Sequence, residues 1–183
     1  MPTRDPLLRA AAVTIDVTAG GGTALARVRA LSGQHASLEA GALLAITGGP
    51  AIARLAVLEV LSGRRGPTAG SVMRTVPDTH TVRLVVSTST GVLLVRSWAH
   101  LPGAARAGRA RARPGDGLAR LHFVFADGPA PADRPRVGRL LEGVRDGDGI
   151  VLALPSAEGV PATVRQRWSI DALPCVAALS RAS

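Results

Sequence analysis

The feature that most constrains this chain is a strand, a glycine turn and a helix in direct succession. Residues 42–47 form a short apolar run, as in a buried strand, and Gly48-Gly49-Pro50 interrupts it. From Ala51 to Leu61 apolar side chains recur at three- and four-residue spacing, which predicts a helix that ends at Ser62-Gly63. The free N–H groups and the dipole of a helix favour an anion at its amino end. This segment is therefore a candidate phosphate site.

The rest of the chain also alternates between strand and helix patterns. Strands are expected at 7–17, 23–31, 71–76, 82–86, 121–126, 150–154 and within 168–179. Further helices are expected at 135–144 and, in a short form, at 160–167, whereas 92–99 is ambiguous. Because the first two strands flank the glycines 20–22, they predict an N-terminal antiparallel hairpin. The pattern as a whole predicts an α/β domain with a partly parallel sheet.

Length and composition favour one globular domain. The 183 residues suit a single domain over 1–183, with a basic Arg/Ala/Gly-rich linker at 104–117. The chain has no Lys, which excludes Schiff-base chemistry, and its single Cys175 excludes an internal disulfide. Its four histidines show no ligand spacing, so no metal site is expected.

Charge and hydropathy indicate the kind of partner and the location. The formal net charge of +9 favours acidic partners, namely nucleotides, nucleic acid or an anionic membrane surface. The first residues do not have the pattern of a signal peptide, and no apolar run is long enough to cross a bilayer. A cytoplasmic protein is expected, and a peripheral position at the cytoplasmic membrane face stays open.

The glycine turn departs strongly from a working phosphate loop. In G-x-x-x-x-G-K-[ST], glycines let the backbone wrap the phosphates, Lys reaches the terminal ones, and the hydroxyl holds magnesium. Here only Gly48 matches. Ala53 stands at the second glycine, Arg54 replaces Lys, and Leu55 replaces the hydroxyl.

The surrounding segments nevertheless resemble, in the correct order, the nucleotide-binding domain of ATP-binding-cassette (ABC) ATPases. Residues 38–48 hold a turn glycine and an apolar strand, residues 56–63 a helix that ends on glycine, and residues 67–72 the next turn and strand. The stretch 123–129, Phe-Val-Phe-Ala-Asp-Gly-Pro, is similar to the magnesium strand that normally ends Asp-Glu-Pro. Residues 148–156 resemble the last sheet strand before the switch histidine.

The departures from that family fall on chemistry. Gly128 replaces the glutamate that polarises water, Pro155-Ser156 stands where the switch histidine belongs, and 87–90 lacks the family's glutamine. The Leu-Ser-Gly-Gly-Gln signature is absent. The stretch between residues 83 and 121 is too short for the family's helical subdomain, whose place the linker takes.

The resemblance implies a degenerate, shortened P-loop NTPase-like domain with a reduced or missing helical subdomain. The leading hypothesis is a pseudo-ATPase, with no catalytic residue and no metal site, that serves as an accessory or regulatory subunit of an ABC transporter. Its partners would be a transporter membrane subunit or an intact ATPase subunit. The nucleotide-binding candidates are Gly48, Gly49, Arg54 and Asp127.

Two alternatives stay open. In the first, the subunit keeps residual ATP binding with weak or no Mg²⁺ dependence. In the second, the arginines of the 104–117 linker bind nucleic acid or another acidic surface. The plainer interpretations are an ordinary strand-to-helix turn at Gly48–Arg54 and a solvated strand-end residue at Asp127.

Overall fold

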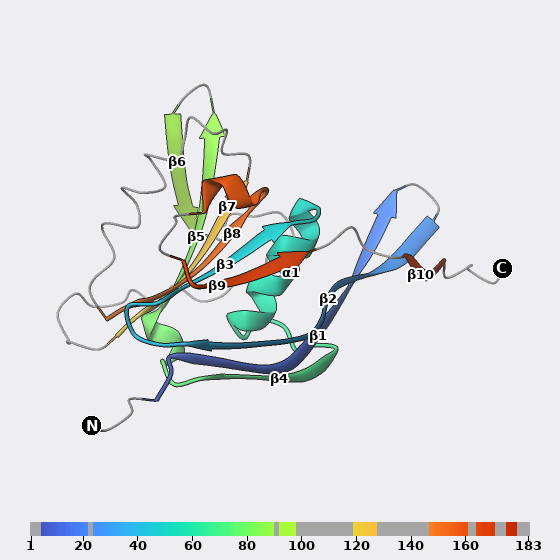
Figure 1. Ribbon diagram of the computed structural model, residues 1–183. Coiled ribbons are helices and arrows are strands. Elements are labelled where there is room, and N and C mark those ends of the chain that lie inside the picture. Colours follow the sequence, from blue (N-terminus) through green and yellow to red (C-terminus); the bar gives the residue numbers. More distant parts are fainter. Residues whose placement is uncertain are drawn as a thin grey trace.

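The molecule is built from two β-sheets with a helix packed between them (Figure 1). The computed structural model describes residues 5–21, 24–89, 92–97, 119–127, 147–160, 164–170 and 175–178. The expected helix at 135–144 and the linker at 104–117 lie outside these residues. The strands of both sheets and the glycine turn lie within the described residues.

One sheet is antiparallel and has the strand order β10-β2-β1-β4. Its strands are β1 (Leu8–Gly21), β2 (Ala24–Leu38), β4 (Ala69–Arg74) and β10 (Cys175–Ala178). The expected N-terminal hairpin is confirmed, because β1 and β2 pair antiparallel along almost their whole length.

The other sheet is mostly parallel and has the order β6-β5-β7-β8-β3-β9. Its strands are β3 (Leu43–Gly48), β5 (Thr81–Ser89), β6 (Val92–Ser97), β7 (Leu121–Asp127), β8 (Gly149–Leu154) and β9 (Gln166–Ile170). Only β6, at one edge, runs antiparallel to its neighbour. The predicted partly parallel sheet is confirmed.

Helix α1 (Ala51–Leu61) has the predicted bounds and joins the two sheets. It contacts β1 and β2 on one side and β3, β7 and β8 on the other. Seven of its eleven residues are consequently buried. Pro50 caps its start without a side-chain hydrogen bond, and Ser62 caps its end. Short 3₁₀ turns occur at Asp78–His80 and Ala157–Gly159.

The structure corrects or completes four expectations from the sequence. The short helix expected at 160–167 is contradicted at residues 164–167, the part of its second half that the structure describes, because Gln166 opens β9. Alternating side chains face inward in this strand, with Trp168 and Ile170 buried and Arg167 exposed. Residues 87–89 continue β5 instead of following it. The ambiguous 92–99 segment contains strand β6, and the C-terminal strand pattern divides into β9 and β10, which lie in different sheets.

The carboxyl end of α1 is tied to β5 by Arg83. Its Nη2 donates to Ser62 O at 2.8 Å and to Asp78 Oδ1 at 3.0 Å, and Arg74 Nη1 donates to the same carboxylate oxygen at 3.1 Å. Partial burial raises the pKa of Asp78, but the hydrogen bonds and charges of Arg74 and Arg83 outweigh it and hold the pKa below its ordinary value.

This cluster predicts a small dependence of stability on pH. Because the folded-state pKa of Asp78 is lowered, its contribution is present above the ordinary carboxyl pKa and is lost as pH falls through the lowered value. At neutral pH, Asp78→Asn should lower the free energy of unfolding by only about 0.5–1 kcal/mol, since the carboxylate is largely exposed. Urea unfolding at neutral and acid pH checks this. A difference between the two proteins that grows as pH falls would contradict it.

The core predicts a much larger effect at β7. Phe123 is fully buried at the centre of the parallel sheet. Phe123→Ala should lower the free energy of unfolding by about 3–5 kcal/mol through lost burial and the cavity left behind. Met73→Ala is the control, because Met73 is 58% exposed and its truncation should change stability by less than about 0.5 kcal/mol. Urea denaturation measures both, and equal effects would contradict the described core.

Candidate phosphate-binding site

The candidate site lies at the carboxyl edge of the parallel sheet. Strand β3 ends at Gly48 and β7 ends at Asp127, with β8 between them, and all three run in the same direction. The carboxyl ends of parallel strands share one edge, which is where α/β sheets bind ligands. The backbone of Asp127 pairs with Ser87 of β5 at this edge. The structure therefore brings the glycine turn and the end of β7 to the same side.

The turn between β3 and α1 is only two residues long, Gly49 and Pro50. A phosphate loop keeps four residues between its first and second glycines to wrap the phosphates. Here the helix has already begun at Ala51, and the N–H groups of Ala53 and Arg54 donate to Pro50 O at 3.0 and 3.2 Å. Pro50 itself has no N–H to offer. The positions that wrap the phosphates in that motif form the first turn of a helix here.

Both glycines are required by packing against the end of β9. Gly48 and Gly49 have left-handed φ values of 80° and 59°. A Cβ on Gly48 would lie 2.8 Å from Ile170 O, and one on Gly49 would lie 2.9 Å from Ile170 Cβ. Because neither glycine has a side chain, Ile170 can pack closely against the turn.

Arg54 turns into the protein. Its side chain is 4% exposed, and its Nη1 donates to Gly49 O at 2.5 Å and to Gly48 O at 3.3 Å. The guanidinium carbon lies 5.8 Å from the ring centroid of Phe125 on β7, within the range of a cation–π contact. Charge-assisted hydrogen bonds of this kind are among the stronger ones in proteins. The cation at the lysine position therefore stabilises the turn and its packing on β7.

The predicted site residues gather at one edge of the parallel sheet. Gly48, Gly49 and Arg54 are in contact, and the backbone of Asp127 lies at the same sheet edge. Sequence reasoning missed Phe125 and Ile170, the two residues that fill the surroundings of the turn. The alternation of polar and apolar residues in 164–170 is the signal that could have placed Ile170.

The residues present do not fit a magnesium-bound nucleotide in this turn. Leu55 stands where the metal-holding hydroxyl belongs, and the turn lacks the backbone that would wrap phosphates. Within the described ranges, no group of His, Cys, Asp or Glu side chains is arranged to hold a metal ion. Two of the cavities lined by described residues, of about 610 and 260 Å³, do not include Gly48, Gly49 or Arg54 in their lining.

Structural comparison identifies the fold. The parallel sheet, the antiparallel sheet and the helix after β3 define a mixed α/β architecture. More particularly, the chain has the fold of the ATP-binding proteins of ABC transporters. It superposes on CbiO1 of Clostridium perfringens, part of the ABC transporter complex CbiONQ, with a TM-score of 0.53 and 13% identity over 91% of this chain and 85% of that one.

Two further solved structures agree. A putative ABC transporter ATP-binding protein from Pyrococcus furiosus gives a TM-score of 0.53 at 11% identity, over 89% of this chain and 96% of that one. A putative metal-chelate type ABC transporter in an inward-facing conformation gives a TM-score of 0.54 at 13% identity, over 93% of this chain and 83% of that one.

Comparison of the sequence with family models and with curated proteins gave no match. In the described part, no helix is long and apolar enough to span a membrane.

The packing of the turn predicts a specific cost for a methyl group. Gly49→Ala should destabilise the protein by about 1–3 kcal/mol more than Gly41→Ala, because only the first places a Cβ against Ile170. Gly41 is the matched control, since its φ of 77° is also left-handed but its Cβ would meet nothing within 4 Å. Urea unfolding of both variants measures the difference. Equal destabilisation would show that the turn has room beside Gly49.

Proposed function

We propose that this chain is a non-hydrolytic ABC ATPase-like protein that acts as an accessory or regulatory subunit of an ABC transporter. The observation that carries the proposal is the direction of Arg54. Its guanidinium is bonded to the carbonyls of the turn, so it does not present a charge to a bound phosphate. The fold supports a relationship to transporter ATPases, and the turn supports a loss of their chemistry.

The chemistry of phosphoryl transfer explains why these changes matter. Catalysis in this class depends on positioning the phosphates and on metal ions that neutralise developing charge, with a residue that orients the attacking water. Leu55 cannot hold magnesium, and Gly128 has no side chain to orient water. The two-residue turn leaves little backbone for positioning the phosphates. Magnesium binding, orientation of the attacking water and positioning of the phosphates are thus each weakened by a different change in the chain.

The partners follow from the structural neighbours. CbiO1 is part of a transporter complex, and the Pyrococcus protein is described as an ATP-binding protein of a transporter. By analogy, this chain would dock on a transporter membrane subunit or pair with an intact ATPase subunit at the cytoplasmic membrane face. The net charge of +9 suits a position beside anionic lipid headgroups.

Residual ATP binding is the second candidate. It is favoured by the gathering of Gly48, Gly49, Arg54 and the end of β7 at one sheet edge. The inward direction of Arg54 makes it the weaker of the two, since nucleotide would have to displace two hydrogen bonds. Calorimetry with Mg-ATP, with Arg54→Ala as the comparison, tests it. Absence of measurable heat at millimolar nucleotide would rule it out.

Hydrolysis provides the test of the proposal. The purified chain should release phosphate from Mg-ATP no faster than its own Asp127→Ala variant, with an intact ABC ATPase assayed beside it as the positive control. Arg54→Lys should not restore turnover, because the lysine would still lack a wrapping loop and a magnesium hydroxyl. Hydrolysis well above background that Asp127→Ala abolishes would overturn the proposal.

A further inference from the structure

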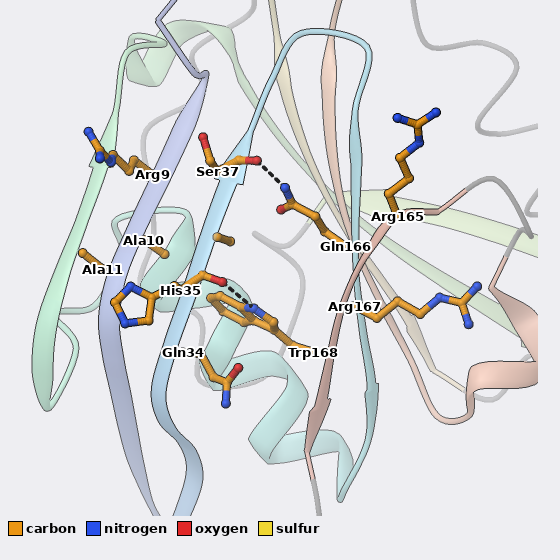
Figure 2. Close-up of a pocket in the computed structure, with 11 residues that line it drawn as sticks. Arg9, Ala10, Ala11, Gln34, His35, Ser37, Arg165, Gln166, Arg167 and Trp168 are labelled. Carbon is orange, nitrogen blue, oxygen red and sulfur yellow. Dashed lines mark hydrogen bonds between the residues drawn. The ribbon is translucent and has the colours of Figure 1, made fainter.

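The larger cavity lies between the two sheets, away from the glycine turn. It has a volume of about 610 Å³ and is lined by residues 9–11 of β1, residues 34–37 of β2 and residues 165–168 at the start of β9 (Figure 2). We name it the inter-sheet groove. Its volume lies within the range of about 300–1,000 Å³ that is common for small-molecule pockets. It is thus large enough for a ligand of nucleotide size.

The floor of the groove is held by two side chains that cross from β9 to β2. Trp168 Nε1 donates to His35 O at 3.2 Å, and Gln166 Nε2 donates to Ser37 O at 2.6 Å (Figure 2). Trp168 is buried, with 4% of its surface exposed. Because these bonds connect the two sheets, the groove is formed before any ligand arrives.

The wall formed by the antiparallel sheet leaves the space open because several of its side chains are short. Ala10, Ala11 and Ala36 line the antiparallel sheet's side of the groove. Ala10 is buried, whereas Ala11 is exposed at the mouth. A larger residue at these positions would fill the volume. The groove therefore combines a fixed aromatic floor with a wall that leaves room.

The charge of the rims is strongly positive. Arg9 lies on the β1 side, and Arg165 and Arg167 lie on the β9 side, with all three side chains exposed and extending outward from the floor (Figure 2). His35 is exposed on the same groove, and none of the lining residues is Asp or Glu. Within the described part of the chain, Arg9, Arg165 and Arg167 form no ion pair. Their charge is available to an anion.

We propose that the inter-sheet groove binds a small phosphorylated molecule, whose phosphates pair with Arg9 on one rim and with Arg165 and Arg167 on the other. Guanidinium groups bind phosphate oxygens bidentately, and long exposed arginines can swing over the mouth of a groove. A compact polyanion fits better than an extended acidic peptide, because three arginines and no carboxylate line one open groove of limited length.

This site is distinct from the glycine turn. Trp168 pairs with Ile46, which lies two residues before Gly48 on β3, and the groove extends from there toward the start of β9. Phosphate bound here would not contact Arg54, which is directed into the turn. The proposal does not depend on whether the chain hydrolyses ATP, and it would give the protein a place to sense a phosphorylated effector.

Fluorescence of Trp168 provides the experiment. The chain has two tryptophans, so a Trp98→Phe background leaves Trp168 as the single reporter beneath the groove. Tripolyphosphate tests the phosphates alone, and ATP shows whether a nucleoside adds affinity. We expect saturable binding that Arg165→Ala/Arg167→Ala weakens about tenfold or more. Circular dichroism verifies that each variant is folded.

Two controls separate this site from general charge and from the turn. Arg106→Ala/Arg109→Ala removes the same charge from the linker, and Arg54→Ala removes the cation of the turn. Both should change the affinity less than about twofold. No saturable signal at millimolar probe, equal weakening by the linker variant, or loss through Arg54→Ala alone would each overturn the proposal. Binding of an acidic peptide but of neither phosphate probe would also overturn it.

Discussion

The guanidinium of Arg54, bonded to the carbonyls of Gly48 and Gly49, is the interaction on which the rest of the site depends. It allows the helix to begin after a turn of only two residues, because it satisfies the carbonyls of the turn from inside. It also places a positive charge inside the protein, over the aromatic ring of Phe125. A lysine directed toward phosphate would leave these carbonyls without that donor.

The same turn is closed from its other side by β9. Ile170 lies against both glycines, so their lack of a side chain is used for packing strand against turn. Helix α1 then continues between the sheets and buries most of its residues there. The turn and the helix are thus held in place by contacts within the protein itself.

Local patterns were sufficient for much of the fold. The spacing from Ala51 to Leu61 predicted α1 with its bounds, and the glycine-flanked strands predicted the hairpin of β1 and β2. The helix expected at 160–167 was wrong at 164–167, because the period-two alternation that marks β9 begins near Val164 and competes with a short helical spacing. Strand β6 was ambiguous in the sequence, although it pairs antiparallel with β5, the strand that directly precedes it in the chain.

The site was harder to predict than the fold. The sequence identified Gly48, Gly49 and Arg54 as a group, but the direction of Arg54 depends on Phe125, which is 71 positions further along the chain and arrives only through sheet pairing. The inter-sheet groove has the same origin. Arg9, His35 and Arg165 carry no common motif, and only the meeting of β1, β2 and β9 places them around one volume.

The measurement that tests the account most directly is an amide NMR titration of the ¹⁵N-labelled protein with Mg-ATP. A phosphate bound at a helix start contacts the backbone N–H groups of the turn, and their chemical shifts report it. If Arg54 and Ile170 close the turn to phosphate, the amide signals of Gly48, Gly49 and Ala51 should not shift at millimolar nucleotide. Saturable, magnesium-dependent shifts at these three amides would show that the turn still works as a phosphate loop and would contradict the account.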